Sequence, residues 1–214
     1  MISRSADITH GELRNIVRAA NPVILEIGAN DGEDTLRLLD YPAESVACFE
    51  CDPRAAAGWR ARVDDPRATL YEVALDEKPG VAVFHQSGGS PRDGVTDWDK
   101  SGSLCRPTGH LAYSPWCTFD NEIKVPTATL DGWARDHLPT GQIDLCWIDV
   151  QGAEMRVFRG GAETLARTRV VKVECHRTQM YEGAPSEAEM LAFFAGWRCL
   201  GRFADDMVFA RDGA

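Results

Sequence analysis

The chain has 214 residues, of which 44% are apolar and 26% are charged, and its formal net charge is -10. This length and composition indicate one globular domain, residues 1–214, with a sizeable core. The acidic balance, without a cluster of lysine and arginine, argues against a nucleic acid partner. No apolar run reaches the length of a membrane span, and residues 1–10 lack the apolar core of a signal peptide.

Seven cysteines are spread singly through apolar segments of the chain. This usage favours buried free thiols in a reducing compartment over a disulfide framework. We therefore expect a cytoplasmic protein that binds neither nucleic acid nor membrane.

Helices and strands alternate in the first third of the chain. The period of the apolar residues predicts, in chain order, a helix at 9–20, a strand at 23–27, a helix at 33–39, a strand at 46–50, a helix at 53–63 and a strand at 68–75. A short strand at 81–85 follows a Lys-Pro-Gly turn, and we expect it to pair with its neighbour.

The segment at about 86–122 shows the period of neither a helix nor a strand. It is rich in Gly, Ser, Pro and Asp, yet it carries the aromatic residues Trp98, Tyr113, Trp116 and Phe119. A loop of this length inside a compact domain is usually functional. We predict a flap over an active site; the simpler alternative is a mobile surface insertion.

The alternation resumes in the second half of the chain. The pattern predicts, in chain order, a helix at 129–138, a strand at 143–150, a helix at 153–167, a strand at 170–175, a helix at 186–195 and strands at 197–203 and 207–211. Alternating strands and helices indicate an α/β fold, a Rossmann-like doubly wound parallel sheet between two layers of helices. The tight turn between the last two strands predicts that these are antiparallel to each other.

The turn Glu26-Ile-Gly-Ala-Asn-Asp-Gly32 joins the first strand to its helix and resembles a cofactor-binding loop. Its glycines let the backbone approach a ligand at the carboxyl end of the strand. The dinucleotide fingerprint requires glycine where the chain has Asn30 and Glu33. A carboxylate at Glu26 would repel a pyrophosphate but suits a cationic ligand with an amino group, such as S-adenosylmethionine. At the end of the next strand, Glu50 can accept hydrogen bonds from ribose hydroxyls. A turn that binds nothing is the alternative.

Five segments resemble those of one family. Residues 143–162, Ile-Asp-Leu-Cys-Trp-Ile-Asp-Val-Gln-Gly-Ala-Glu and onward, resemble the signature Ile-Asp-x-(x)-Lys-Ile-Asp-Val-Glu-Gly-x-Glu of FkbM-type methyltransferases. Residues 28–35 resemble the Gly-Ala-Asn-x-Gly-x-x-Thr of that family, and residues 49–50 resemble its Phe-Glu. Residues 129–131 resemble its Thr-Leu-Asp, and residues 101–104 its serine-bearing loop. The combination covers most of the chain and is specific, although each piece alone is not.

The resemblance implies a class I methyltransferase with a seven-stranded sheet whose last strand is antiparallel. It further implies O-methylation of a sugar or secondary metabolite with S-adenosylmethionine as the methyl donor. Two positions depart from the family, because Trp147 stands in place of its usual Lys and Gln151 in place of its usual Glu.

The turn and the resemblance together yield a set of candidate cofactor-binding residues. In this interpretation Asn30 and Thr35 hold the methionine end and Glu50 holds the ribose, while residues after the second and third strands line the adenine. The set comprises Glu26, Gly28, Ala29, Asn30, Asp31, Thr35, Glu50, Cys51, Ala74, Leu75, Ser103 and Asp149.

The candidate catalytic residues lie at the ends of two neighbouring strands. Asp149 ends its strand beside the expected reacting centre, and His176 is the expected general base because histidine titrates near neutrality. Glu174 either orients His176 or binds the acceptor. Two alternatives remain open: His176 has a purely structural role, or Asp149, Glu174 and His176 together hold a Mg²⁺ ion that activates the acceptor.

Two other functions remain as alternatives to O-methylation of a small-molecule hydroxyl. N-methyltransferases of small molecules or peptides often carry a Pro-Pro-aromatic motif after the fourth strand, where this chain has residues 149–152 without it. A catalytically inactive cofactor-binding module is the second alternative, because Trp147 and Gln151 lack the charges of the family residues. The aromatic residues of the flap predict stacking on a ring or sugar face of the acceptor.

Overall fold

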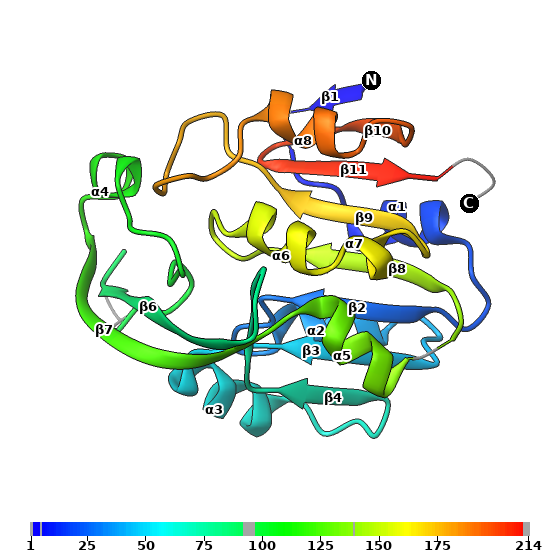
Figure 1. Ribbon diagram of the computed structural model, residues 1–214, viewed down its shortest axis with the longest axis horizontal. Helices are drawn as coiled ribbons and strands as arrows, with labels where there is room; N and C mark the ends of the chain where they lie inside the picture. The colour runs from blue at the N-terminus through cyan, green and yellow to red at the C-terminus, as the bar shows by residue number, and fades with distance from the viewer. Residues whose placement is uncertain (1, 5, 92–96, 139, 212–214) are drawn as a thin grey trace.

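The structure is a computed structural model, and it describes residues 2–4, 6–91, 97–138 and 140–211. The strands of its main sheet are β1 (Ile2–Arg4), β2 (Val23–Ile27), β3 (Ser45–Phe49), β4 (Ala68–Tyr71), β8 (Ile143–Ile148), β9 (Thr168–Glu174), β10 (Arg198–Phe203) and β11 (Asp206–Ala210). They lie in the order β1-β10-β11-β9-β8-β2-β3-β4 (Figure 1). The strands from β9 to β4 are parallel, whereas β11 is antiparallel to both β9 and β10.

The predicted fold class is confirmed. Seven strands form the expected sheet with an antiparallel last strand, and β1 adds an unpredicted eighth strand parallel to β10 at the edge.

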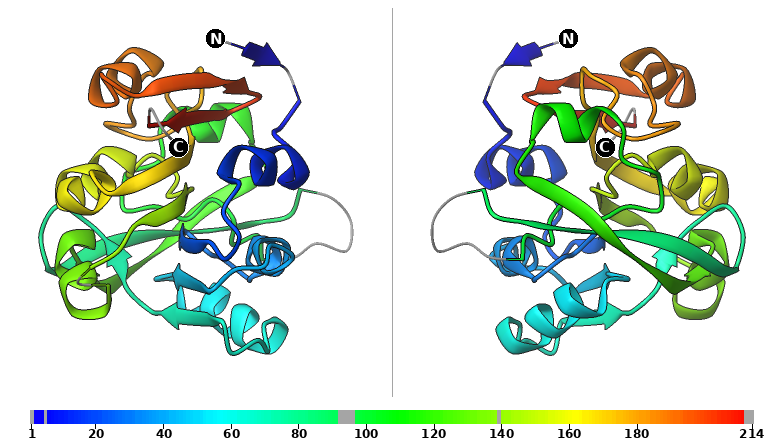
Figure 2. Two further views of the ribbon diagram at one scale, coloured as in Figure 1. Left: turned by 90° about the vertical axis from the view of Figure 1, so that its right-hand side faces the viewer. Right: turned by 90° about the vertical axis from the view of Figure 1, so that its left-hand side faces the viewer.

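Helices cover both faces of this sheet (Figure 2). One face carries α1 (His10–Val17), α2 (Glu33–Leu39) and α3 (Pro53–Arg62); the other carries α5 (Leu130–His137), α6 (Glu154–Gly160), α7 (Ala162–Leu165) and α8 (Glu187–Phe193). The alternation of side chains along a strand supplies both cores, because Leu25 and Ile27 of β2 pack on one face while Ile24 packs on the other. Among the described residues, no helix has both the length and the apolarity needed to span a membrane.

Local capping determines where several helices begin and end. A capping box begins α1, with the Glu12 amide donating to Thr9 Oγ1 and the Thr9 amide donating to Glu12 Oε2. The helix ends earlier than predicted, at Val17, because Arg18 adopts a left-handed conformation with φ of 50°. The single helix predicted at 153–167 is instead divided into α6 and α7 at a Gly-Gly pair.

The prediction was wrong for the strand at 68–75 and incomplete for the flap. The strand divides after Tyr71, and β5 (Ala74–Leu75) joins a second sheet with β7 (Cys117–Ala128) and β6 (Gly80–Gly89) in the order β5-β7-β6. β6 and β7 form a long antiparallel pair that curves across the carboxyl end of the main sheet (Figure 1). The flap thus consists of the end of β6, the start of β7, the short helix α4 (Gly109–Tyr113) and the connecting loops. Residues 92–96 of the predicted flap lie outside the described part of the chain.

Candidate functional site

The glycine turn brings the carboxyl ends of β2, β3 and β8 into contact. Gly28 has φ of 90°, and a Cβ at this position would lie 1.7 Å from the carbonyl oxygen of Asp149. The amides of Gly28 and Ala29 both donate to the carbonyl oxygen of Phe49 at the end of β3. Only glycine fits at position 28, and the close approach of the backbones forms the floor of a pocket.

This pocket contains most of the residues that the sequence predicts for cofactor binding, and we call it the cofactor pocket for that reason. Its floor follows the glycine turn, one wall follows β3 and β5, and the far end reaches the residues after β8. The predicted residues that line it are Gly28, Ala29, Asn30, Asp31, Glu50, Cys51, Ala74, Leu75 and Asp149.

Glu50 is buried at the edge of the cofactor pocket and is held rigidly by backbone donors. Its Oε2 accepts from the amide of Asn30 at 2.9 Å, and its Oε1 accepts from the amides of Cys51 and Asp52 at 2.7 Å each. Burial raises the pKa of Glu50 to about 7, although these three amides counteract it. The carboxylate keeps a fixed orientation at the position where the sequence predicts ribose binding.

Glu26 and Thr35 do not face the pocket, contrary to the prediction. Glu26 points to the opposite side of β2, where its Oε2 accepts from Thr35 Oγ1 at 2.5 Å and from Cys48 Sγ at 3.3 Å. Trp59 Nε1 of α3 donates to Thr35 Oγ1 at 2.9 Å, which completes a buried network under α2 and α3. Burial raises the pKa of Glu26 to about 8. The physical reason is strand alternation: Glu26 lies between two residues of the opposite core.

Ser103 also lies outside the pocket lining. It is buried, and its Oγ donates to the carbonyl oxygen of Gln151 at 2.7 Å while accepting from the amide of Cys105. Its role is therefore to connect the flap to the loop after β8. Its neighbours Gly102 and Leu104 do line the pocket.

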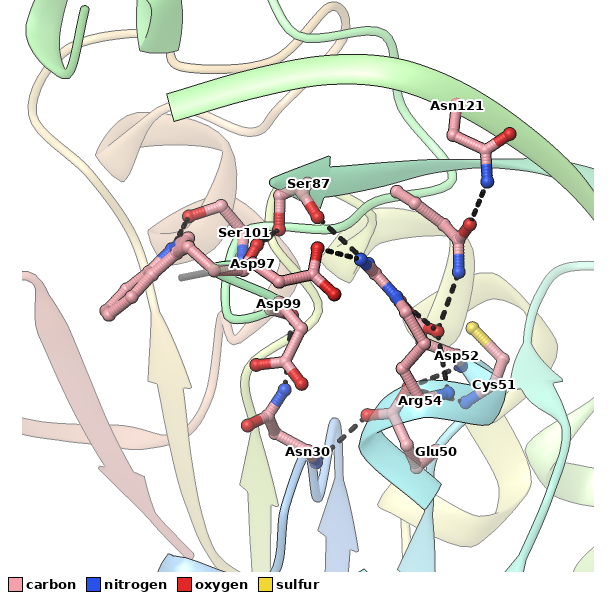
Figure 3. A network of polar contacts seen from close by, with 12 residues as sticks. Asn30, Glu50, Cys51, Asp52, Arg54, Ser87, Asp97, Asp99, Ser101 and Asn121 are labelled. Atoms are coloured by element: carbon pink, nitrogen blue, oxygen red, sulfur yellow. Dashed lines mark hydrogen bonds and ion pairs between the residues drawn. The ribbon is translucent and has the colours of Figure 1, made fainter. Parts of the chain in front are cut away.

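The flap segment 97–104 is anchored over the pocket by polar contacts that the sequence did not reveal (Figure 3). Arg54, at the start of α3, pairs with Asp52, with Asp97 Oδ1 at 3.0 Å and with the carbonyl oxygen of Ser87 at 2.9 Å. Asn30 Nδ2 of the glycine turn donates to the carbonyl oxygen of Asp99 at 3.2 Å. These contacts support the predicted placement of the flap over the site and bring Asp99 and Lys100 into the pocket lining.

The far end of the pocket carries a polar cluster after β8 and β9. Gln151 Nε2 donates to Asp149 Oδ1 and to Glu174 Oε2, both at 2.7 Å. The hydroxyl of Tyr181 lies 2.8 Å from Gln151 Oε1 and from the carbonyl oxygen of Ser101 in the flap. A Cβ at Gly152 would lie 2.7 Å from the Tyr181 side chain, so glycine is needed there. Sequence reasoning missed Tyr181, because no local pattern marks it.

His176 lies beside Glu174, as predicted, and the two belong to a charged cluster. Its Nε2 is 3.4 Å from Glu174 Oε1, and its Nδ1 is 3.5 Å from Asp205 Oδ2. Burial disfavours the imidazolium, but the hydrogen bond and charge of Glu174, with the charge of Asp205, outweigh it and raise the pKa of His176 to about 9. His176 is therefore largely protonated near neutral pH.

A second cavity adjoins this cluster on the side away from the glycine turn. It is lined by the segment after β9, by Glu154 and by the start of α8, and Glu174, His176 and Tyr181 face it. The Glu174 side chain is contacted from two sides. Gln151 donates to it from the side of the cofactor pocket, and His176 pairs with it on the side of the second cavity. The Asp149–Gln151–Glu174 cluster thus lies between the linings of the two cavities.

The alternative magnesium site is not supported by this geometry. Within residues 2–4, 6–91, 97–138 and 140–211, no group of three or more His, Cys, Asp and Glu is arranged to hold a metal ion. The N–H groups of Gln151 occupy the space between Asp149 and Glu174, where a bridging cation would need oxygen ligands.

Trp147, which replaces the usual Lys of the family, packs on the helical face that carries α1. Its ring stacks on His10 with a centroid distance of 5.1 Å, and Lys172 Nζ of the neighbouring strand lies 3.8 Å from the ring centroid. Lys172 also pairs with Asp206 at 2.7 Å. The Trp147 side chain is therefore part of the packing beneath the sheet rather than of either cavity.

Comparisons with known proteins identify the family of the chain. Residues 26–203 match the methyltransferase FkbM domain family. The 2-O-methyltransferase NoeI of Sinorhizobium fredii (strain NBRC 101917 / NGR234) is 42% identical over 177 residues, which is 81% of this chain and 71% of that protein. The crystal structure of methyltransferase FkbM from Methylobacillus flagellatus KT aligns with a TM-score of 0.55 and 12% identity, over 89% of this chain but only 44% of that one.

The structural match shows the fold alone, whereas the family match spans most of the chain and agrees with the sequence resemblance. The chain belongs to the FkbM family of methyltransferases.

Proposed function

We propose that the chain transfers a methyl group from S-adenosylmethionine to a hydroxyl group of a small, polyhydroxylated molecule such as a sugar. The observation that carries the proposal is the cofactor pocket, which joins an apolar end to a charged end across the glycine turn. S-adenosylmethionine has this same division, with adenine at one end and an amino acid at the other.

The residues of the pocket fit this cofactor. Leu75, Phe84 and Leu104 provide apolar surface for a purine next to Glu50, whose carboxylate suits the ribose hydroxyls. At the turn, the Asn30 side-chain oxygen is buried and has no hydrogen-bond partner among the described residues. A buried acceptor left unpaired is costly, so an ammonium group of a ligand would stabilise it.

When bound, S-adenosylmethionine supplies a methyl group that is already activated for displacement. The chain then has two tasks, to align the acceptor and to accept its proton. Asp149 and Gln151 lie between the two cavities, so they are positioned to align the reactants. The pair of Glu174 and His176 faces the second cavity and is the proposed base. Because the pKa of His176 is raised, proton acceptance by the imidazole becomes efficient only at alkaline pH.

The second cavity is the proposed acceptor site, and its charge limits the acceptor. Among the described residues, four carboxyl groups line it, from Glu154, Glu174, Glu187 and Glu189, against Arg177 and His176. Burial raises the pKa of Glu154 to about 7 and, with the charge of Asp149, that of Glu174 to about 8, so these two are partly protonated near neutral pH. A phosphorylated or carboxylated acceptor would be repelled, whereas neutral hydroxyl groups can donate to these carboxylates. We therefore propose a neutral acceptor rich in hydroxyl groups.

Two observations favour this function over its alternatives. A relative 42% identical to the chain bears the name 2-O-methyltransferase, which favours a hydroxyl over a nitrogen acceptor. The position of Trp147 removes one of the two grounds for an inactive module, because the ring packs away from both cavities.

The test combines binding and transfer with the purified protein. S-adenosylmethionine is titrated by calorimetry, and methyl-labelled cofactor is then incubated with neutral sugars, sugar phosphates and amines, with and without EDTA. We expect binding, label on neutral sugars and no effect of EDTA. Binding without transfer to any hydroxyl would favour the inactive module, and transfer only to amines would favour N-methylation.

A further inference from the structure

The charged end of the cofactor pocket is mostly acidic. Among the described residues that line it, the carboxylates near the glycine turn belong to Asp31, Glu33, Asp34 and Asp99, and the cations are Arg37 and Lys100. An acidic pocket suits the sulfonium and ammonium groups of the proposed cofactor. The carboxylate of its amino acid part, however, needs a positive partner at this same end.

Arg37 is already committed to protein carboxylates. Its two terminal nitrogens pair with Glu33 Oε1 at 2.5 Å and with Asp34 Oδ1 at 2.9 Å, both on the same helix. The side chain is about half exposed, at 51%, so it lies along the outer surface of α2. A ligand carboxylate would have to replace these two bonds.

Lys100, in contrast, has only long ionic contacts with the part of the chain that the structure describes. Its Nζ lies 3.5 Å from Asp31 Oδ1 and 3.3 Å from Glu33 Oε2. Both carboxylates have a closer cation, because Asp31 pairs with Arg62 at 2.6 Å and Glu33 pairs with Arg37 at 2.5 Å. The ammonium of Lys100 is therefore available to a third anion at the mouth of the pocket.

Hydrogen bonds of the flap hold the backbone on both sides of Lys100 in place. Asn30 Nδ2 holds the carbonyl oxygen of Asp99, the residue before it, and the Ser101 amide donates to Ser87 Oγ at 3.1 Å. With both neighbours anchored, the side chain of Lys100 leaves the flap at a defined point above the glycine turn.

We propose that Lys100 binds the carboxylate of the cofactor's amino acid part and thereby joins the flap to the bound cofactor. The inference rests on the proposed function. It assigns to the flap the methionine-end contact that the sequence had assigned to Thr35, which lies instead in the buried network with Glu26. Binding of the cofactor then also fixes the flap, because the ligand bridges Lys100 and the glycine turn.

The experiment compares two ligands that differ only in this carboxylate. S-adenosylmethionine and decarboxylated S-adenosylmethionine are titrated by calorimetry against the wild type, Lys100→Met and Lys100→Arg. We expect the wild type to bind the carboxylate-bearing ligand about tenfold more tightly. Lys100→Met should remove this preference without weakening the decarboxylated ligand, and Lys100→Arg should keep it. Lys124→Met, which removes an exposed lysine of β7, is the matched control and should behave as wild type.

Two results would overturn the inference while leaving the proposed function intact. One is a wild-type preference that Lys100→Met does not change. The other is an equal loss for both ligands in Lys100→Met, which would mean that Lys100 only stabilises the flap. If the wild type binds neither ligand, the proposed function fails, and the inference fails with it.

Discussion

The side-chain nitrogen of Gln151 lies 2.7 Å from Glu174 Oε2, so the turn that follows β8 donates directly to the last residue of β9. The same nitrogen donates to Asp149 Oδ1, which uses both of its hydrogen atoms. The amide thus lies between two carboxylates, one in the lining of each cavity. A glutamate here, as in the family pattern, would place a third carboxyl group between them.

Replacing Gln151 with Met should leave these two carboxylates without their shared donor. We expect the free energy of unfolding at neutral pH to fall by about 1–3 kcal/mol, the usual cost of unpaired buried polar groups. Urea denaturation measures it, and Gln142→Met, at an exposed position, is the control. Equal stability of the two variants would show that the bridge between Asp149 and Glu174 contributes nothing.

The pH dependence of the reaction should follow the pair of Glu174 and His176. Because Glu174 is a main cause of the raised pKa of His176, the rate should rise with pH toward about 9 in the wild type. Glu174→Gln removes the charge that stabilises the imidazolium, so the rising limb should move to lower pH, toward 6.5. The measurement is the pH profile of kcat/KM.

The control for this profile is Glu182→Gln, which changes an exposed carboxylate near the second cavity. Its rising limb should coincide with that of the wild type. If the rising limb of the kcat/KM profile lies at the same pH in Glu174→Gln as in the wild type, His176 is excluded as the titrating base.

Replacing Glu26 with Gln should change the stability of the protein at alkaline pH without changing its affinity for the cofactor. The pKa of Glu26 is about 8 in the folded protein, above its ordinary value of 4.5, so its stabilising contribution is complete below 4.5 and is lost as pH rises through 8. The Glu26→Gln side chain does not ionise, so the variant does not lose stability in this way as pH rises. Its free energy of unfolding should exceed that of the wild type at pH 9 but not at pH 4.5, as measured by urea denaturation at both pH values.

The same variant should bind S-adenosylmethionine with an affinity within about twofold of the wild type, a difference of less than 0.5 kcal/mol. The reason is that the Glu26 side chain faces Thr35 and Cys48 rather than the pocket. Glu44→Gln, at an exposed position, controls for the change of net charge. A tenfold loss of affinity in Glu26→Gln alone would restore the original assignment of Glu26 to the cofactor.

Replacing Arg54 with Met should release the flap from α3. The variant loses the contacts with Asp97 and with the carbonyl oxygen of Ser87, so amide hydrogen exchange in 97–104 should become faster. Cofactor affinity should fall by about three- to tenfold, because binding must then order the flap. Arg60→Met, on an exposed part of the same helix, should change neither quantity. Unchanged exchange in Arg54→Met would show that other contacts hold the flap.

Part of the site could be predicted because its signals are local. A glycine at position 28 and a carboxylate at Glu50 are properties of short segments whose backbone is determined by their own residues and by burial. The pocket contains both, as the sequence indicated. Short apolar runs likewise predicted most strands of the main sheet, because the centre of each strand is buried on both faces.

The flap was harder to predict because its contacts join distant parts of the chain. β7 exposes much of its length to solvent, and its charged residues conceal the period of a strand that pairs with β6. Asn30 contacts Asp99 across 69 positions, and Arg54 contacts Asp97 across 43. No window of sequence contains both partners of such a pair.

By itself, the sequence determined the fold class, the family and the turn on which the cofactor pocket is built, because these depend on local backbone preference and on the period of burial. The tertiary structure alone decided which side chains face the pocket. It places Glu26 and Thr35 in a buried network and places Lys100 beside the glycine turn. The physical reason is that the direction of a side chain depends on which face of the sheet its neighbours fill, and the position of a loop depends on partners far along the chain.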